Sequence, residues 1–328
     1  MSELTDTLDP LPVSVAPMMD WTDRHCRVFH RMLSPSARLY TEMVHCAAVL
    51  RGDRDRLLDN RDVRGPVALQ LGGSDPAQMA EAAAVGVKYG YDEININVGC
   101  PSDRVQSGHF GACLMAHPET VAACVRAMRA RIDVPVTVKT RIGIDDDDSD
   151  AFFFDFVDQV CEAGCTHLIV HARIAVLAGL SPKQNREIPP LNYARVHRLK
   201  TRCPDLHVTI NGGLRSPVDV AAHTNHVDGA MIGRAAYQTP WLLAELEHQR
   251  GSALAPPSRH DVMRQLMDYA QHERARGIPL RAVARHTLGL FQGQPGARRF
   301  RRTLSEGMHR PDADVSVIEQ ALSHVLAA

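Results

Sequence analysis

The sequence predicts an α/β fold, a (β/α)8 TIM barrel followed by a small all-helical C-terminal domain. Eight short apolar, β-branched runs recur at spacings too long for hairpins, and helical patterns lie between most of them. No Gly-x-Gly-x-x-Gly follows the first run, so a doubly wound open sheet is the second choice. Strand-like runs stop near residue 245. We therefore expect residues 1–244 to form the barrel and residues 245–328 the helical domain.

Each predicted element follows from the local periodicity of apolar residues and from residues that typically begin or end a helix. The predicted strands are residues 13–18, 39–43, 67–71, 93–98, 134–140, 167–171, 207–210 and 229–232. The predicted helices between them are residues 79–87, 118–131, 151–164, 193–202 and 216–223. Asp75 and Ser216, each followed by proline, predict helix starts. The predicted tail helices are residues 259–276, 280–291, 297–308 and 315–326, after a linker at 251–257.

Composition narrows the class of protein. The chain has 328 residues, of which 45% are apolar, and no apolar run approaches the ~20 residues of a membrane span. Residues 1–12 lack a basic region followed by an apolar one, so we expect no secretory signal there. The eight cysteines show no paired metal spacing, which suits reduced thiols in a cytoplasmic enzyme. The net charge of −1 neither favours nor excludes a nucleic-acid partner.

The most informative segment is the turn after the fourth predicted strand. An apolar run ends abruptly at Gly99-Cys100-Pro101, which places a thiol at the carboxyl end of a strand, where parallel α/β folds bind ligands. Cys100 is therefore a candidate acid or nucleophile. The alternative is a buried structural cysteine. The flanking Asn97, Gly99 and Pro101 favour the first interpretation, because a core strand needs none of them.

Polar residues also follow most other predicted strands, and together they would surround the mouth of a barrel. They are Asp20, Gln70, Lys139, Arg141, His171, Arg173, Asn211 and Arg234. Each alone is weak evidence, since Lys139 could extend from a strand end to solvent and His171 could be a core histidine. As a set they predict a site.

The last two strand ends predict a phosphate-bearing cofactor. Gly212, Gly213 and Gly233 would let backbone N–H groups approach a phosphate, and Arg234 adds charge. Flavin mononucleotide (FMN) fits the other groups. Gln70 can hydrogen-bond the ring edge, and Lys139 would stabilise the anionic reduced ring. The backbone at Pro17, Met18 and Met19 would cover one face.

Five motifs resemble those of tRNA-dihydrouridine synthases, in the same order and over nearly the whole chain. They are Val-Ala-Pro-Met-Met-Asp (15–20), Ala-Leu-Gln-Leu-Gly-Gly (68–73), Asn-Val-Gly-Cys-Pro-Ser (97–102), Val-Lys-Thr-Arg-Ile-Gly (138–143) and Ile-Asn-Gly-Gly (210–213). Segments 107–115 and 179–191 are similar to the A-type branch, which is associated with tRNA uridines 20 and 20a. Gln184 departs from the pattern, where an acid would be expected.

The resemblance implies a ping-pong flavoenzyme in which NADPH reduces FMN and the reduced flavin then reduces uridine. Hydride would go to C6 of uracil, and Cys100 would give a proton to C5. A cysteine thiol suits this role because its ordinary pKa of ~8.5 keeps it mostly protonated at neutral pH. Asn97 would bind uracil or ribose. Lys139, His171 and Arg173 would line the flavin side, although Arg173 is also a candidate tRNA contact and His171 could instead contact uracil O2 or O4. Cys113, on the same loop, is a second candidate acid.

The tail predicts the tRNA contact. Between residues 281 and 310 stand seven arginines and one acid, Glu306. Such a run is usually a solvated face, but guanidinium groups suit phosphates. We expect tRNA contacts from Arg298, Arg299, Arg301 and Arg302 of the tail. The loop after the sixth strand would add Lys183, Gln184, Arg186 and Glu187.

Two rival functions and a metal site are the alternatives to this assignment. A dihydroorotate-dehydrogenase-like oxidoreductase acting on a free pyrimidine would share the flavin barrel but would have no use for a basic tail. A non-catalytic RNA-binding protein would not need the set of site residues. The acids Asp145 to Asp148 are expected to cap a helix rather than to bind a metal, so we predict no metal site. No stable protein partner is expected either.

Overall fold

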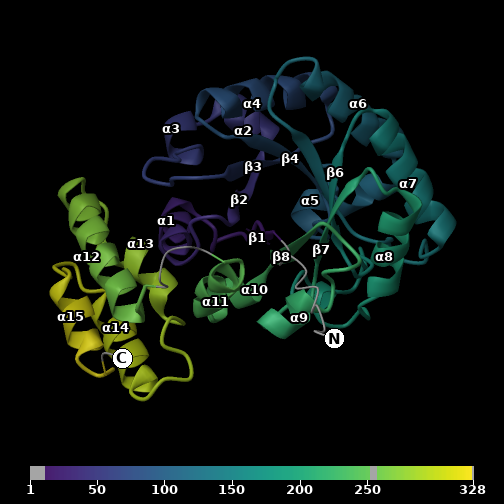
Figure 1. Ribbon diagram of the computed structural model, residues 1–328. Helices are drawn as coiled ribbons and strands as arrows, with labels where there is room; N and C mark the ends of the chain where they lie inside the picture. The colour runs from purple at the N-terminus through teal and green to yellow at the C-terminus, as the bar shows by residue number, and fades with distance from the viewer. Residues whose placement is uncertain (1–11, 252–256, 327–328) are drawn as a thin grey trace, which may run out of the picture.

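The computed structural model describes residues 12–251 and 257–326, and its centre is a closed barrel of eight parallel strands. Neighbours in sequence are neighbours in the barrel, and β8 closes onto β1 (Figure 1). The predicted fold class is therefore confirmed. The strands are β1 (Val13–Val15), β2 (Arg38–His45), β3 (Val67–Gly72), β4 (Glu93–Val98), β5 (Val136–Thr140), β6 (His167–His171), β7 (His207–Asn211) and β8 (Gly229–Ile232).

The first two strands differ most from the prediction. β1 ends at Val15 instead of residue 18, because Pro17 lacks an N–H and the carbonyl of Met18 accepts turn hydrogen bonds from Trp21 and Thr22. β2 continues to His45, with a register shift against β3.

Helices follow the strands, and most of them cover the outside of the barrel (Figure 1). They are α1 (Arg24–Leu33), α2 (Cys46–Arg51), α3 (Arg54–Leu57), α4 (Pro76–Lys88), α5 (Asp103–Ser107), α6 (Pro118–Arg129), α7 (Asp150–Glu162), α8 (Tyr193–Arg202), α9 (Pro217–Ala221), α10 (Arg234–Gln238) and α11 (Trp241–Gln249). The side chains of Asp75 and Ser216 cap α4 and α9 as predicted.

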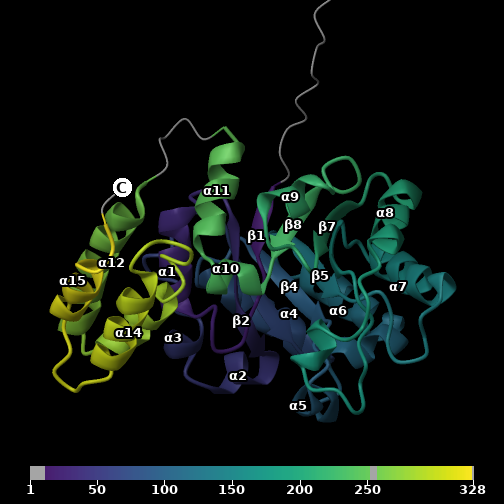
Figure 2. The same ribbon diagram turned by 90° about the horizontal axis from the view of Figure 1, so that it is seen from below.

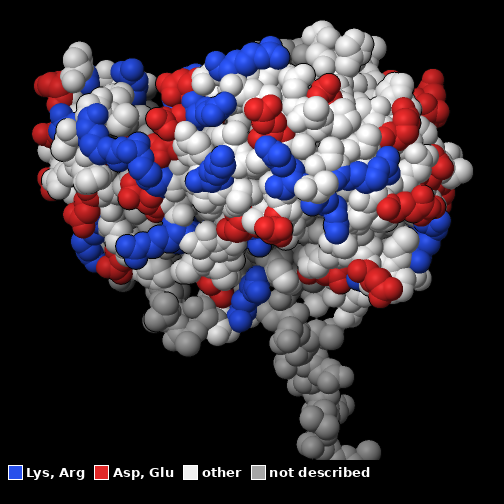
Figure 3. Space-filling model, turned by 90° about the horizontal axis from the view of Figure 1, so that it is seen from above, with Lys and Arg blue, Asp and Glu red and all other residues white. Residues whose placement is uncertain are grey.

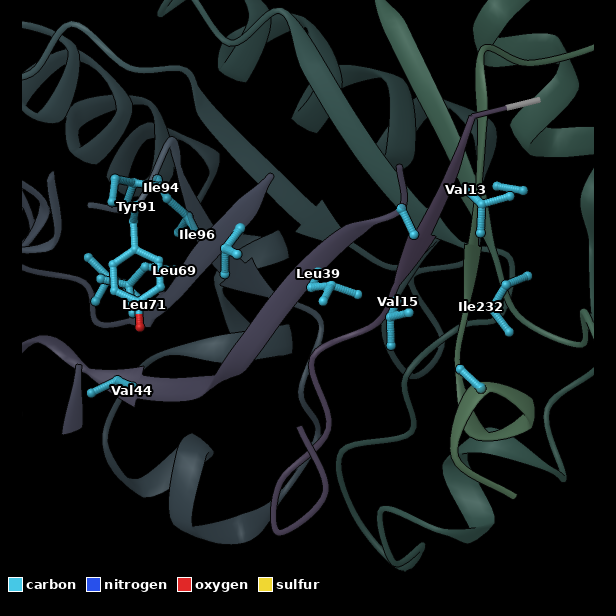
Figure 4. Packing of buried hydrophobic residues seen from close by; sticks show 14 of the residues in the cluster. Val13, Val15, Leu39, Val44, Leu69, Leu71, Tyr91, Ile94, Ile96 and Ile232 are labelled. Carbon is cyan, nitrogen blue, oxygen red and sulfur yellow. The ribbon is translucent and has the colours of Figure 1, made fainter. Parts of the chain in front are cut away.

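The main core lies between the strands and the surrounding helices. Figure 4 shows part of it, where Leu69 and Leu71 of β3 lie near Ile94 and Ile96 of β4 and all four are fully buried. A second, smaller apolar cluster consists of Ala16, Tyr40, Ala68, Ile169 and Met231.

The tail is helical, as predicted, but the second and the last of its helices are shorter than expected. Its elements are α12 (Arg259–Ala275), α13 (Leu280–Ala284), a 3-10 turn (Arg285–Thr287), α14 (Ala297–Gly307) and α15 (Ser316–Leu322). The prediction of one helix over 280–291 is wrong beyond Thr287. Gly289 and Gly293 disfavour helix there, and a Cβ at Gly289 would lie 2.2 Å from the Gln238 carbonyl oxygen.

The tail packs against α1 on one side of the barrel (Figure 1). The proposed boundary at residues 244 and 245 falls inside α11, and the domain division stays a prediction. Most of the predicted linker, and residues 1–11, lie outside the described part. None of the helices in the described ranges is long and apolar enough to span a bilayer.

Candidate active site

The carboxyl ends of the strands meet at one end of the barrel. In Figure 2, α2 and α5, which follow β2 and β4, both lie at the lower edge of the barrel. Parallel barrels build their active sites at this carboxyl end.

Cys100 lies in the turn after β4, and Asn97 holds that turn. The Asn97 side-chain oxygen accepts hydrogen bonds from the backbone N–H groups of Gly99 at 3.2 Å and Cys100 at 3.0 Å. The Cys100 thiol is half-buried, with its sulfur 3.6 Å from the Ser102 hydroxyl. The thiol therefore sits on a fixed backbone, as a proton donor requires.

A cavity of about 1030 Å³ opens beside this thiol. It extends from Cys100 and Met19 to His25 of α1 and to Ile278 and Ala282 at the tail. The barrel and the tail thus share one concave surface that contains the thiol. Such a volume accommodates a group much larger than a single base.

Gln70 and Asn97 are joined directly. The Asn97 amide donates to the Gln70 side-chain oxygen at 2.7 Å, and the Gln70 amide donates to Asn95 at 2.7 Å. Both site residues are buried. Asn97 thus already makes three hydrogen bonds within the protein, which the sequence did not indicate.

Lys139 and His171 lie on the adjoining strands β5 and β6. The Lys139 ammonium donates to the Asn211 side-chain oxygen at 3.1 Å. Burial, and then the charge of Arg141, lower the pKa of Lys139 to about 7. The same two causes, in the same order, hold the pKa of His171 well below its ordinary value, so its imidazole is neutral at pH 7. The prediction that these residues share a site is consistent with their register in the barrel.

Two arginines at the same end brace loops. Buried Arg141 donates to the carbonyls of Gly99 at 3.1 Å and of Ile174 and Asn185 at 3.0 Å each. It therefore ties the Cys100 turn to the loop after β6. Arg173 donates to the Pro189 carbonyl, while its Nε is buried without a hydrogen-bond partner.

The predicted phosphate site is built of glycines and cations. Gly212 and Gly213 have φ values of +107° and +77°, a region that glycine enters without steric cost. A Cβ at Gly213 would lie 2.5 Å from the Tyr193 hydroxyl, whereas one at Gly233 would meet nothing within 4 Å. Open space at Gly233 and the unpartnered Arg173 Nε fit a phosphate group. Arg234 instead pairs with Glu187 at 2.5 Å, a contact that the sequence did not predict.

The turn after β1 borders the cavity. Met19 is 55% exposed and lines it, while Pro17 and Met18 are half-buried. The Met18 N–H donates to the Thr22 hydroxyl at 2.9 Å, which fixes the turn. This segment is in place to cover a ligand at the barrel mouth.

Comparison with known proteins decides the family of this chain. The family described as "Dihydrouridine synthase (Dus)" matches residues 14–326. The chain belongs to the dihydrouridine synthase family. This family is flavin-dependent.

Curated members of the family are similar over almost their full length. A "tRNA-dihydrouridine(20/20a) synthase" of Xanthomonas axonopodis pv. citri is 56% identical over 312 residues, covering 95% of this chain and 93% of the relative. The proteins of the same name from Salmonella typhimurium and Vibrio cholerae are 54% and 53% identical, covering 95% of this chain and 94% and 96% of theirs.

In this dihydrouridine synthase family member, the four predicted tRNA-binding residues of the loop after β6 are exposed. Lys183, Gln184, Arg186 and Glu187 lie in and beside a 3-10 turn. The intervening Asn185 is fully buried and holds the loop, accepting from the Val176 N–H at 2.7 Å. Sequence reasoning missed Asn185, because its role depends on a loop conformation.

The tail arginines are exposed on α14. Phe300 and Leu304, on the opposite side of that helix, are buried. The exposed set is Arg298, Arg299, Arg301 and Arg302. Arg302 pairs with Glu306 at 2.9 Å, and Arg301 donates to Gln292 at 2.8 Å. On the side of the molecule seen in Figure 3, Lys and Arg side chains are interspersed with Asp and Glu, so this side has no single continuous basic face.

One arginine of the basic run has another function. Arg285 pairs with Asp23 of the barrel at 2.5 Å, and His286 lies 3.1 Å from the same carboxylate. Arg24, which follows Asp23 in the sequence, pairs with Glu273 of α12. We name Asp23, Arg24, Glu273, Arg285 and His286 the tail clamp. Sequence reasoning missed it, since its members come from distant segments.

Proposed function

We propose that this chain reduces uridines 20 and 20a of tRNA to dihydrouridine, with FMN as bound cofactor and NADPH as reductant. The observation that carries the proposal is the Cys100 thiol, fixed by Asn97 beside a cavity of about 1030 Å³ between barrel and tail. The names of the curated relatives support the same substrate and positions.

The residues at the barrel mouth fit FMN. Gly212, Gly213, Gly233 and Arg173 would receive the phosphate, with Arg234 available once it leaves Glu187. Lys139 has a pKa of about 7, so its amine is only partly protonated at neutral pH. An anionic ring beside it would raise that pKa and make the side chain fully charged. When bound and reduced, the flavin supplies a hydride.

Cys100 completes the reduction. Addition of hydride at C6 of uracil leaves an electron pair at C5, and Cys100 gives its proton there, so the C5–C6 double bond becomes a single bond. The thiolate that remains is reprotonated from solvent through the open cavity. Cys113 is a weaker candidate, because its thiol donates to the Phe110 carbonyl at 3.1 Å and burial raises its pKa.

The target base must leave its stack to reach this thiol, and backbone contacts offset that cost. We propose that the exposed arginines of α14 and the loop after β6 supply those contacts. Under this proposal residues 245–328 are the tRNA-binding domain, residues 1–244 the catalytic domain, and the enzyme acts in the cytoplasm without a stable protein partner.

An anaerobic experiment tests the proposal. FMN-loaded protein is reduced with one equivalent of NADPH and mixed with unmodified tRNA, free uridine or orotate. Reoxidation of the flavin by tRNA alone is expected. Rapid reoxidation by orotate would instead indicate an enzyme acting on a free pyrimidine.

A further inference from the structure

A row of buried polar side chains runs inside the barrel toward the turn that carries the thiol. Glu93, Asn95 and Asn97 alternate along β4 and therefore point to the same side, with Gln70 of β3 and Thr137 of β5 in register beside Asn95. Their exposed fractions run from 0% to 8%. Barrel interiors are usually filled by branched apolar side chains, and burial of polar groups is costly unless they are hydrogen-bonded.

These five side chains form one hydrogen-bonded chain with a single direction. The Asn97 amide donates to Gln70 at 2.7 Å, and the Gln70 amide donates to Asn95 at 2.7 Å. The Asn95 amide donates to the Thr137 hydroxyl at 2.8 Å, which donates to Glu93 at 2.7 Å. Every donor therefore points toward Glu93.

Both ends of the chain impose this direction. A carboxylate only accepts, and the backbone N–H groups at the other end, bound by Asn97, only donate. Burial raises the pKa of Glu93. The Arg38 Nε, 3.2 Å from the Glu93 carboxyl group, and the Tyr40 hydroxyl, which donates to it at 2.6 Å, oppose that rise and favour the carboxylate. Rotating any amide in the chain by 180° would bring two donors or two acceptors together.

We propose that Glu93 and Thr137 are positioning residues that orient the Asn97 amide for uridine reduction. The Asn97 oxygen accepts two hydrogen bonds and has no lone pair left, so one N–H is the only group that its amide can still offer at the barrel mouth. Such a donor suits a carbonyl oxygen of uracil and not the amino group of cytosine. This inference deepens the proposed function and rests on it.

Three substitutions separate positioning from stability. Thr137→Val interrupts the chain, and Thr137→Ser keeps the hydroxyl. Tyr40→Phe is the matched control, because it removes an equally buried donor to the same Glu93 oxygen that does not lead to Asn97. Each variant is loaded with FMN, reduced with NADPH and reoxidised with unmodified tRNA without oxygen.

Thr137→Val should slow tRNA-driven reoxidation roughly tenfold, the effect of about one net hydrogen bond, and leave NADPH-driven reduction within about twofold. Thr137→Ser and Tyr40→Phe should both stay within about twofold in each half-reaction. A readout without flavin is the alkylation rate of Cys100 by iodoacetamide, followed by mass spectrometry. Thr137→Val should raise it, since the turn is held less firmly, and Tyr40→Phe should not.

Equal behaviour of Thr137→Val and Tyr40→Phe in both assays would overturn the inference, because the chain would then be only structural. If Thr137→Val does not fold, Asn95→Ala breaks the same chain and carries the same expectations. Failure of tRNA to reoxidise the wild-type flavin would refute the proposed function instead, while the alkylation rates would still test the chain.

Discussion

The Asn97 side-chain oxygen accepts a hydrogen bond, at 3.0 Å, from the backbone N–H of Cys100, which lies three residues further along the chain. This hydrogen bond explains why an asparagine precedes the thiol at this spacing. The turn is fastened to β4 by its own side chain, so the position of the thiol follows that of the strand. Strand positions are fixed by the barrel, which makes the thiol a preorganised group.

Cys100→Ala should retain FMN binding and NADPH-driven flavin reduction but lose most uridine reduction. The thiol acts only in the second half-reaction, and general acids contribute roughly 10²–10⁴-fold. Stopped-flow absorbance of the flavin measures both halves. Cys113→Ala, on the same loop, is the control and should keep both. Reoxidation of the Cys100→Ala flavin by tRNA at the wild-type rate would exclude Cys100 as the acid.

Arg141→Lys should destabilise the protein by about 1–3 kcal/mol. The guanidinium group of Arg141 donates to three loop carbonyls, and the single ammonium group of lysine cannot replace all of these hydrogen bonds. The free energy of unfolding from urea titration measures this loss. Arg198→Lys is the control, since Arg198 is exposed and pairs with Asp150 on the surface. Superimposable unfolding curves for Arg141→Lys and the wild type would contradict the bracing role.

The double substitution Arg298→Gln and Arg302→Gln should weaken tRNA binding. It should also reduce the salt slope, which is the slope of the logarithm of the binding constant against the logarithm of the salt concentration, by roughly one unit for each phosphate that is no longer neutralised. Flavin reduction by NADPH should not change, because phosphate contacts set affinity and register. Glu306→Gln should strengthen binding by freeing Arg302. Arg202→Gln, exposed on α8, is the control. If the double variant bound tRNA with the wild-type salt slope, these arginines would not be part of the tRNA-binding surface.

The tail clamp predicts an acid-sensitive stability. Burial alone would raise the pKa of Asp23, but His286, the Cys26 N–H and Arg285 together hold it well below its ordinary value. A lowered pKa means that the stabilisation is complete above about pH 4, the ordinary value for aspartate, and is lost as the pH falls toward the folded value. Asp23→Asn keeps a capping oxygen for α1 but removes the charge, and should cost about 1–2 kcal/mol at pH 7.

Urea unfolding of Asp23→Asn and the wild type at pH 7 and pH 3 checks this prediction. The difference in free energy should shrink at pH 3, where the wild-type carboxylate loses part of its advantage. Asp158→Asn, which breaks an exposed pair with Arg202, should change little at either pH. A difference that grows at pH 3 would contradict the assignment.

The barrel could be predicted because its signals are local. Apolar runs, capping residues and glycines fixed β4 and β6 at their observed bounds and placed Cys100 at a strand end. The alternation of Glu93, Asn95 and Asn97 also marks one face of a strand, but their partners on β3 and β5 follow only from barrel register. The Asp23–Arg285 pair joins residues 262 positions apart, and no local pattern predicts it.

The most direct test of the central claim is a map of dihydrouridine in cellular tRNA. A bacterial strain that lacks its own synthase for uridines 20 and 20a is complemented with this chain or with Cys100→Ala, and dihydrouridine is located by sequencing. The account predicts that the wild-type chain restores dihydrouridine at positions 20 and 20a and that the variant does not. Absence of dihydrouridine at both positions, with the wild-type protein expressed and flavin-loaded, would contradict it.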